Sequence, residues 1–155
     1  MSSVKIKMAG PLTTIQDKGR IEYQQSGMSV SGVMDDYSFR AANLLVGNPE
    51  TEGVLECTLL GPTMEFTGDA VFAVTGATAQ VKVNGQPSFI WRAIRVKAGD
   101  TVSFSMTTSG TRLYIAFAGG IDVPEVMGSK STYMKAKVGG FEGRNLKTGD
   151  ELQLS

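Results

Sequence analysis

The chain has 155 residues and carries 15 Lys+Arg against 15 Asp+Glu, so its formal net charge at pH 7 is zero. That balance provides no basic excess for nucleic acid or anionic lipid, and no apolar run has the length of a membrane span. We therefore expect one soluble, cytoplasmic domain over residues 1–155, a size that buries roughly 68–70% of the unfolded surface.

The absence of histidine limits the chemistry further. Serine–histidine and cysteine–histidine nucleophiles are excluded, and a zinc site is not expected. The acidic residues are scattered, so we expect no carboxylate-rich metal site either. Any acid–base catalysis by this chain must use carboxylates, lysine or tyrosine, unless another protein supplies the group.

Glycine punctuates the whole chain. The 19 glycines separate short apolar runs, which predicts a mainly β domain with many tight turns. Alternation, β-branched residues or continuous apolar runs predict strands, and Asn84-Gly85 is the strongest hairpin signal. We expect strands near residues 4–8, 13–15, 54–60, 63–66, 70–74, 80–83, 101–106, 113–118 and 151–154.

One convincing helix is predicted, over residues 35–46. Asp35 or Asp36 can cap its N-terminus, and Gly47 is placed to end it. Four apolar residues recur at helical spacing: Phe39, Ala42, Leu45 and Val46. Asn43 on this helix is either functional or merely exposed.

The strand predicted at residues 54–60 holds two notable side chains. Cys57, the single cysteine, cannot form an internal disulfide, and we interpret it as a buried apolar residue rather than a nucleophile. Glu56 interrupts an apolar run, so it lies either on a wet face or beside a partner. We expect Arg112 to support the fold through a carboxylate such as Glu56.

A first candidate site lies before a predicted turn. Gln16, Asp17 and Arg20 bring an amide, a carboxylate and a guanidinium close together. Arg20 could bind a carboxylate or phosphate through two parallel hydrogen bonds. The alternative is a local pair between Asp17 and Arg20 on the surface, worth roughly 0–1 kcal/mol.

A second candidate site follows the buried strand predicted at residues 113–118. The strand stops at Gly119-Gly120, and a loop rich in hydroxyls follows at residues 128–132. Rigid strands often end in loops of this kind at binding sites, although a core strand with a plain surface turn has the same pattern. The loop fails the phosphate-binding P-loop pattern, because an extra serine precedes Lys130 and position 123 is valine.

Short motifs then follow one another in a fixed order over nearly the whole chain. They are residues 10–17 (GPLTTIQD), 19–20 (GR), 31–32 (SG) with 34–35 (MD), 43–48 (NLLVGN), 55–56 (LE), 61–62 (GP), 75–76 (TG), 112–114 (RLY), 119–120 (GG), 128–129 (GS) with 131–132 (ST), 139–140 (GG), 143–144 (GR) and 149–150 (GD). The ordered set resembles the allophanate hydrolase subunit 2 family. That family is also called a biotin-dependent carboxyltransferase family, and it includes the C subunit of bacterial 5-oxoprolinase and part of the carboxyltransferase region of urea carboxylase.

The resemblance implies a cyclophilin-like β-barrel with one or two short helices. Family members are about twice this long, so the chain resembles their N-terminal half, and this half alone is expected to be inactive. Lys18 stands where the family generally has an apolar residue. The family works with a B subunit or an adjoining domain, and the site is expected near that junction.

The first function that the resemblance implies is that of one component of an ATP-dependent 5-oxoprolinase, which opens 5-oxoproline to glutamate. The complex would bind ATP and a small amide, with B-like and A-like subunits as partners. We expect catalytic roles for Asp17, Arg20 and Asp35. Arg20 would hold a carboxylate or phosphate, and Asp35 would accept an N–H hydrogen bond or act as base, unless it only caps the helix. The expected substrate-binding residues are Gln16, Asn48, Gly119, Gly120, Ser129, Ser131 and Thr132.

Two alternatives stay open. The chain could belong to a biotin-dependent carboxyltransferase acting on urea or a related amide, with a biotin carrier from elsewhere, because no acceptor lysine is visible here. It could instead be a non-catalytic module that binds a partner, like the family member that antagonises a sporulation-kinase inhibitor.

Overall fold

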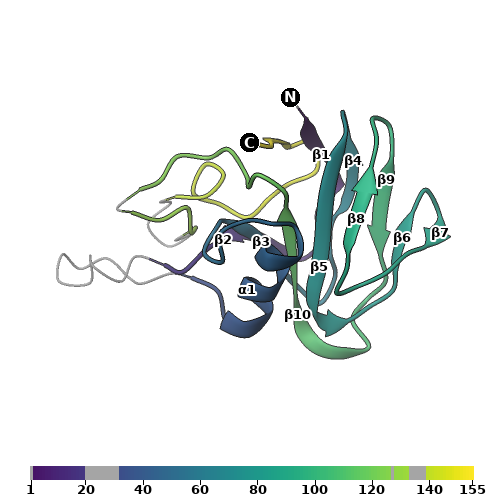
Figure 1. Ribbon diagram of the computed structural model, residues 1–155, viewed down its shortest axis with the longest axis horizontal. Helices are drawn as coiled ribbons and strands as arrows, with labels where there is room; N and C mark the ends of the chain where they lie inside the picture. Colours follow the sequence, from purple (N-terminus) through teal and green to yellow (C-terminus); the bar gives the residue numbers. More distant parts are fainter. Residues whose placement is uncertain (1, 20–31, 127, 133–138) are drawn as a thin grey trace.

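The computed structural model describes residues 2–19, 32–126, 128–132 and 139–155, which form two antiparallel sheets and one helix (Figure 1). The first sheet has six strands in the order β11-β1-β4-β9-β6-β7. Their bounds are β1 Ser3–Met8, β4 Thr63–Phe66, β6 Val81–Val83, β7 Gln86–Pro87, β9 Thr101–Phe104 and β11 Glu151–Gln153.

The second sheet holds Gln16, Glu56 and Arg112 among the residues singled out in the sequence. Its five strands have the order β2-β3-β10-β5-β8. They are β2 Leu12–Gln16, β3 Val54–Thr58, β5 Ala70–Thr78, β8 Ala93–Val96 and β10 Ser109–Phe117. The mainly β class with a short helix is thus confirmed, and the described strands form two sheets rather than one closed barrel.

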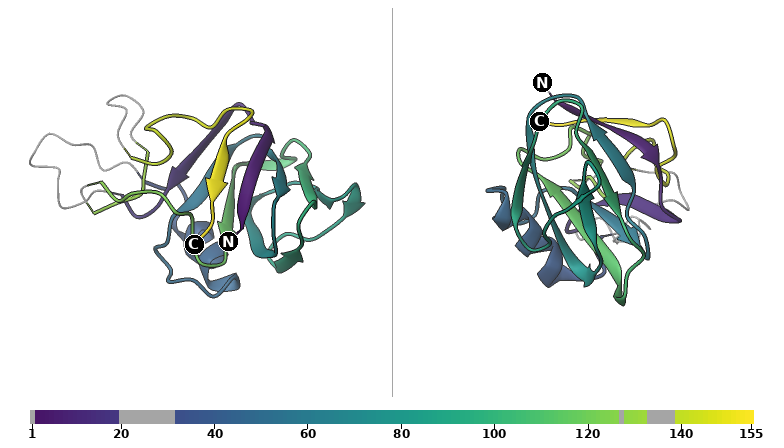
Figure 2. Two further views of the ribbon diagram at one scale, coloured as in Figure 1. Left: turned by 90° about the horizontal axis from the view of Figure 1, so that it is seen from above. Right: turned by 90° about the vertical axis from the view of Figure 1, so that its right-hand side faces the viewer.

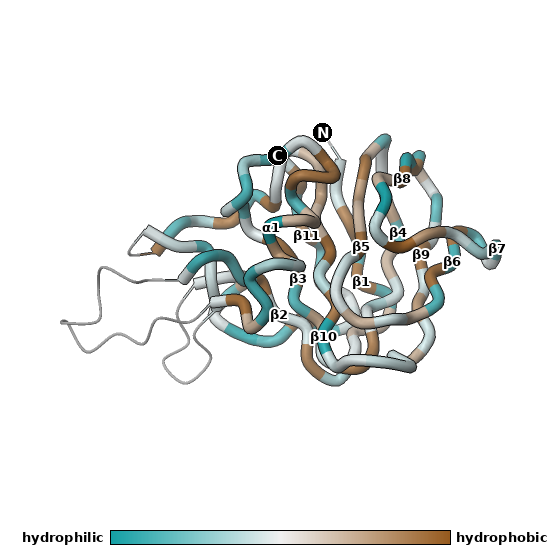
Figure 3. Tube along the Cα trace, turned by 60° about the horizontal axis from the view of Figure 1, so that its bottom comes forward, coloured by the Kyte–Doolittle hydropathy of each residue, from teal (hydrophilic) through white to brown (hydrophobic). Residues whose placement is uncertain are grey.

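The main core lies between the two sheets. Phe66 of the first sheet packs on Phe72 and Phe117 of the second, with ring centroids 5.8 and 6.1 Å away. Figure 3 shows hydrophobic positions recurring along the strands, as expected when alternate side chains enter the core. Cys57 is fully buried in this core, which confirms its interpretation as an apolar residue.

Helix α1, Asp36–Leu45, covers the outer face of the second sheet (Figure 2). Asp35, one of the two residues predicted for this role, is the N-cap, and the helix ends at Leu45 with Val46 as the C-cap, one residue before the predicted end. A smaller apolar cluster joins helix and sheet: Phe39, Ala42, Val54, Tyr114 and Ala116. Asn43 is also buried here, so its interpretation as an exposed residue is wrong.

Two strands end two residues earlier in the structure than the sequence predicts. β3 ends at Thr58, because Leu59 takes a positive φ of 68°, and β9 ends at Phe104 rather than at residue 106. The hairpin at Asn84-Gly85 is confirmed between β6 and β7. At the chain ends, β1 pairs with β11, which brings the two described termini side by side (Figure 1).

An irregularity in β10 shapes the site. Ser109 pairs with Thr78 and Leu113 pairs with Gly76, so four steps along β10 oppose two along β5. The residues between them leave the ladder to β5, while Arg112 keeps its register with β3. Such bulges bend a strand and redirect its side chains, and they recur beside binding sites.

Candidate functional site

A row of polar side chains crosses the face of the second sheet that α1 covers. The register places Thr14 opposite Glu56, Glu56 opposite Tyr114, and Tyr114 opposite Thr75. All four are buried. Buried polar groups cost free energy unless they are paired, and each of the four has a partner: Tyr114 and Glu56 bond each other, Thr14 accepts from Gln16, and Thr75 donates to the Ser38 carbonyl oxygen.

Tyr114 is the centre of that bonding. Its hydroxyl donates to Glu56 Oε2 at 2.7 Å and accepts from the backbone N–H of Asp35 at 2.9 Å. The backbone N–H of Met34 donates to the same Glu56 oxygen at 2.8 Å. Burial, followed by the hydrogen bond to Glu56, holds the pKa of the Tyr114 hydroxyl above its ordinary value, so it remains a donor.

Asp35 is fixed from two sides. Tyr114 holds its backbone, while its carboxylate accepts from Ser38 N at 3.1 Å and Ser38 Oγ at 2.6 Å. The N-cap role proposed from the sequence is therefore present. Two hydrogen bonds do not exhaust the roughly four acceptor positions of a carboxylate, so Asp35 can still accept a bond from a ligand N–H.

An open cleft of about 390 Å³ begins at Asp35. It lies where β10 leaves the ladder to β5, and its lining includes Met34, Gly76, Gly110 and Arg112. Its volume is within the range of small-molecule sites, about 300–1,000 Å³. The lining includes one acidic and one basic side chain: Asp35, at the N-cap of α1, and Arg112, on β10.

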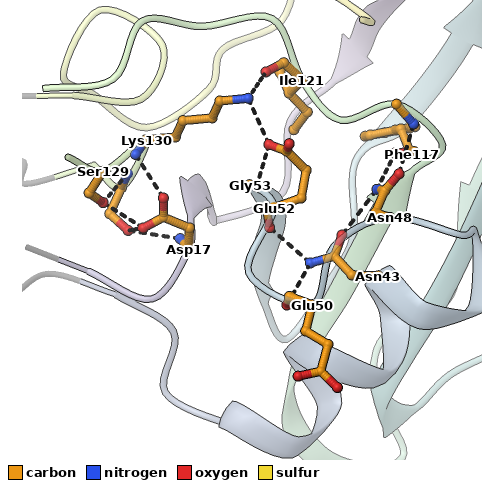
Figure 4. Close-up of polar contacts among 12 residues, drawn as sticks. Asp17, Asn43, Asn48, Glu50, Glu52, Gly53, Phe117, Ile121, Ser129 and Lys130 are labelled. Carbon is orange, nitrogen blue, oxygen red and sulfur yellow. Dashed lines mark hydrogen bonds and ion pairs between the residues drawn. The ribbon is translucent and has the colours of Figure 1, made fainter.

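Asp17 organises a separate network at the end of β2 (Figure 4). Its Oδ1 accepts from Ser129 Oγ, Ser131 Oγ and Gly19 N, and its Oδ2 accepts from Lys130 N. The carboxylate therefore binds the loop at residues 128–132 to β2. Its acceptor positions are largely filled, which makes Asp17 an anchor for this loop, and a catalytic role for it stays a prediction.

The loop at residues 128–132 is tied to the helix end as well. Lys130 Nζ lies 2.6 Å from Glu52 Oε1 and 2.9 Å from the carbonyl oxygen of Ile121 (Figure 4). Asn43 Nδ2 donates to the carbonyl oxygens of Glu50 and Glu52. These bonds join the loop at residues 128–132 to Ile121 and to the segment that follows α1, which lies 78 residues away at Glu52.

Asn48 supports the glycine turn. Its Nδ2 donates to the carbonyl oxygen of Phe117 at 2.8 Å, and its Oδ1 accepts from Gly119 N at 2.8 Å. A Cβ on Gly119 would stand 2.2 Å from the carbonyl oxygen of Ser155, so only glycine fits there. Asn48 and the turn thus form one unit, whose substrate-binding role stays a prediction.

Gln16 and Thr132 meet at the edge of β2. Gln16 Nε2 donates to Thr14 Oγ1 at 2.9 Å and to the carbonyl oxygen of Thr132 at 3.3 Å. The buried Gln16 Oε1 has no hydrogen-bond partner within the described ranges. Thr132 itself bonds the Ile15 carbonyl through both its backbone N–H and its hydroxyl.

The structure thus arranges the described site residues in three groups. The first is formed by Gln16, Asp17, Ser129, Ser131 and Thr132, the second by Asn48 with Gly119 and Gly120, and the third by Asp35, at the cleft. The first and third groups approach each other where Val33 N donates to the Asp17 carbonyl oxygen at 3.1 Å. Arg20 lies outside the described residues, so its place beside Asp17 or Asp35 stays a prediction.

The expected pair between Arg112 and Glu56 is wrong. Register places Arg112 opposite Thr58, two pairs further along than Glu56, and the Glu56 carboxylate bonds Tyr114 and Met34 instead. Sequence reasoning also missed Tyr114 as the centre of the polar row. The available signal was Glu56 itself, because a carboxylate in an apolar strand requires a donor from a neighbouring strand.

Within residues 2–19, 32–126, 128–132 and 139–155, no three His, Cys, Asp or Glu side chains come together in a way that could hold a metal ion. No described helix is long and apolar enough to cross a membrane.

Comparison with known proteins gives a consistent result. A family model described as "Carboxyltransferase domain, subdomain A and B" matches residues 26–155. Over 97% of its length the chain is 45% identical to the C subunit of 5-oxoprolinase from Escherichia coli, of which it covers 49%. Over 99% of its length it is 44% identical to urea amidolyase of Saccharomyces cerevisiae, of which it covers 8%.

The fold agrees with these relatives. The crystal structure of Kluyveromyces lactis urea carboxylase matches with a TM-score of 0.95 and 42% identity, over 98% of this chain and 14% of the other. The chain therefore spans about half the length of the Escherichia coli relative and a small part of the urea-converting proteins.

Proposed function

Because the chain belongs to the family of carboxyltransferase domains with subdomains A and B, we propose that it is part of an enzyme that activates a small amide. We further propose that this enzyme is an ATP-dependent 5-oxoprolinase. The observation that carries the finer proposal is the 45% identity to the C subunit of 5-oxoprolinase across 97% of the chain.

The cleft at Asp35 supplies what such an enzyme needs from this chain. An amide is a poor electrophile, and phosphoryl transfer from ATP to the amide oxygen would activate it. ATP is bound by the complex as a whole, with A-like and B-like subunits as partners. Asp35 accepts the amide N–H and orients the ring. Tyr114 holds the backbone of Asp35, and Ser38 donates to its carboxylate.

The second candidate function is a carboxyltransferase component that acts on urea or a related amide with a biotin carrier. The TM-score of 0.95 to urea carboxylase and the 44% identity to urea amidolyase favour it. In this version Asp35 again accepts an amide N–H, and the substrate receives a carboxyl group from carboxybiotin instead of a phosphoryl group from ATP.

The test uses the intact gene product that contains this chain, mixed with its A-like and B-like partners. ATP hydrolysis driven by 5-oxoproline is measured with this gene product present and with it omitted. Turnover that requires it supports the proposal. A complex that assembles but needs bicarbonate, a biotinylated carrier and urea supports the second candidate, and an assembled complex without any turnover indicates a regulatory module.

A further inference from the structure

One charged side chain of the cleft, that of Arg112, has N–H donors that bond none of the described residues. Arg112 is half-buried at the point where β10 leaves the ladder to β5, and its guanidinium forms no hydrogen bond or ion pair with the described residues. A guanidinium carries five N–H donors in a planar fork and keeps its charge at physiological pH. Partial burial removes some of its water, so an acceptor in the cleft would be favourable.

The backbone around Arg112 keeps that space open. Gly76 takes a φ of 96°, and a Cβ there would come within 2.4 Å of the Arg112 carbonyl oxygen. The irregular pairing between β5 and β10 starts at this glycine, and both Gly76 and Arg112 line the cleft. The bulge therefore separates Arg112 from β5, while Arg112 stays paired with β3, and it leaves Arg112 at the cleft.

Arg112 and Asp35 border the same cleft but form no ion pair with each other. Alternation along β10 places Arg112 on the same face as Tyr114, and Tyr114 holds the backbone of Asp35. Neither charge is cancelled by the other. The cleft thus offers a forked donor and a carboxylate acceptor at separate positions, which fits a molecule that carries both an anionic group and an N–H donor.

We propose that Arg112 binds the carboxylate of a small cyclic amide while Asp35 accepts the ring N–H. This inference rests on the proposed function and names the substrate group that the cleft selects. A lactam that bears a carboxylate satisfies both side chains. Urea has N–H donors but no carboxylate, and it would leave the Arg112 fork unfilled.

A comparison of two ligands isolates the contribution of the substrate carboxylate to binding. 5-Oxoproline and pyrrolidin-2-one share the lactam ring, and only the first carries a carboxylate. Isothermal titration calorimetry measures the affinity of each for the assembled complex of the intact gene product. Because charge-assisted hydrogen bonds are strong, Arg112→Gln is expected to weaken 5-oxoproline binding by about 10- to 100-fold and to leave pyrrolidin-2-one unchanged.

Two further variants complete the comparison. Arg112→Lys keeps the charge without the fork and should give an intermediate loss for 5-oxoproline alone. Arg95→Gln is the matched control, because Arg95 is an exposed residue of β8 that does not line this cleft, and neither affinity should change.

The outcomes separate this inference from the function on which it rests. If the complex turns over 5-oxoproline but Arg112→Gln affects both ligands equally or neither, the assignment of Arg112 is overturned and the function is retained. If 5-oxoproline binds in an Arg112-dependent way without turnover, the proposed function fails and the carboxylate site stands. If the complex neither binds nor turns over 5-oxoproline, both are overturned.

Discussion

At the scale of single residues, Tyr114 joins three parts of the molecule. It lies on β10, donates to Glu56 on β3, and accepts from the backbone of Asp35 at the start of α1. The hydroxyl is one atom that satisfies a buried carboxylate and a backbone N–H together. Such a group costs more to remove than a surface hydroxyl, because its loss leaves two partners without a hydrogen bond.

Replacing Tyr114 by phenylalanine should therefore lower the free energy of unfolding by about 1–3 kcal/mol, with little change in packing volume. Urea unfolding followed by circular dichroism measures the loss. Tyr37→Phe is the matched control, because Tyr37 is 76% exposed and keeps its ring contact with Trp91 in the variant. Equal stabilities of the two variants would contradict the role given to the Tyr114 hydroxyl.

The single cysteine gives a second prediction at this scale. Burial raises the pKa of the Cys57 thiol to about 12, and only the thiolate reacts readily with disulfide reagents. In the native protein at pH 8, Cys57 should therefore react with 5,5′-dithiobis(2-nitrobenzoate) no faster than the protein unfolds. In urea, which unfolds the protein, one thiol per chain should react. Complete labelling within seconds under native conditions would show that Cys57 is accessible.

At the scale of elements, short loops are fixed by bonds to distant parts of the chain. The Gly119-Gly120 turn is held by Asn48 and lies against Glu52, which in turn bonds Lys130 of the hydroxyl-rich loop (Figure 4). The two loops predicted to bind substrate are thus linked through the Glu52 carboxylate. A substitution in the Gly119-Gly120 turn should therefore alter the stability of the loop at residues 128–132.

Gly120→Ala tests that coupling. A Cβ at Gly120 would stand 2.6 Å from Glu52 Cδ, so the Glu52 side chain must shift, and we expect this to weaken its bonds to Lys130 and Gly53 N. Gly99→Ala is the matched control, because its φ of 89° is close to the 86° of Gly120 and nothing lies within 4 Å of its Cβ.

Both variants should lose about 1–2 kcal/mol from the positive φ, and Gly120→Ala should lose about 1–3 kcal/mol more from the displaced carboxylate. Hydrogen exchange should also become faster at residues 129–132 in Gly120→Ala alone. Equal losses, with unchanged exchange at that loop, would show that the turn and the loop are independent.

The start of β11 has a pH-dependent contact. Arg144 bonds both oxygens of Asp150 at 2.8 and 2.9 Å, and this contact is the main cause that lowers the pKa of the Asp150 carboxyl. Because the pKa of this carboxyl is lower in the folded state than in the unfolded state, the contact stabilises the fold at pH values above the unfolded-state pKa of about 3.9. That stabilisation is lost as the pH falls through the folded-state pKa.

Asp150→Asn should therefore be less stable than the unchanged protein by about 1 kcal/mol at pH 7, and the difference should shrink as the pH falls below about 4. Urea midpoints at pH 7, 5 and 3 measure this trend. Asp69→Asn, at a carboxylate outside this ion pair, serves as control. A difference that stays constant with pH would remove the ion pair from the explanation.

At the scale of the whole molecule, the sequence predicted those features that depend on residues close together in the chain. The β class, the α1 cap at Asp35 and the buried Cys57 follow from alternation, capping and apolar context. The contact of Asp17 with Ser131 spans 114 residues, and the bond from Tyr114 to Glu56 depends on strand register. No periodicity encodes which strands pair, so those contacts, and the cleft beside them, required the structure.

Asp35→Asn, measured by 5-oxoproline-driven ATP hydrolysis in the assembled complex, tests the central claim most directly. Asparagine caps a helix about as well as aspartate, so the fold should be preserved. If the carboxylate orients the amide or accepts its proton, kcat/KM should fall by about 10²- to 10⁴-fold. Asp36→Asn, at the neighbouring exposed carboxylate that pairs with Arg40, should leave turnover unchanged. Near-normal turnover in a stable Asp35→Asn complex would contradict the proposed role and leave Asp35 as a helix cap alone.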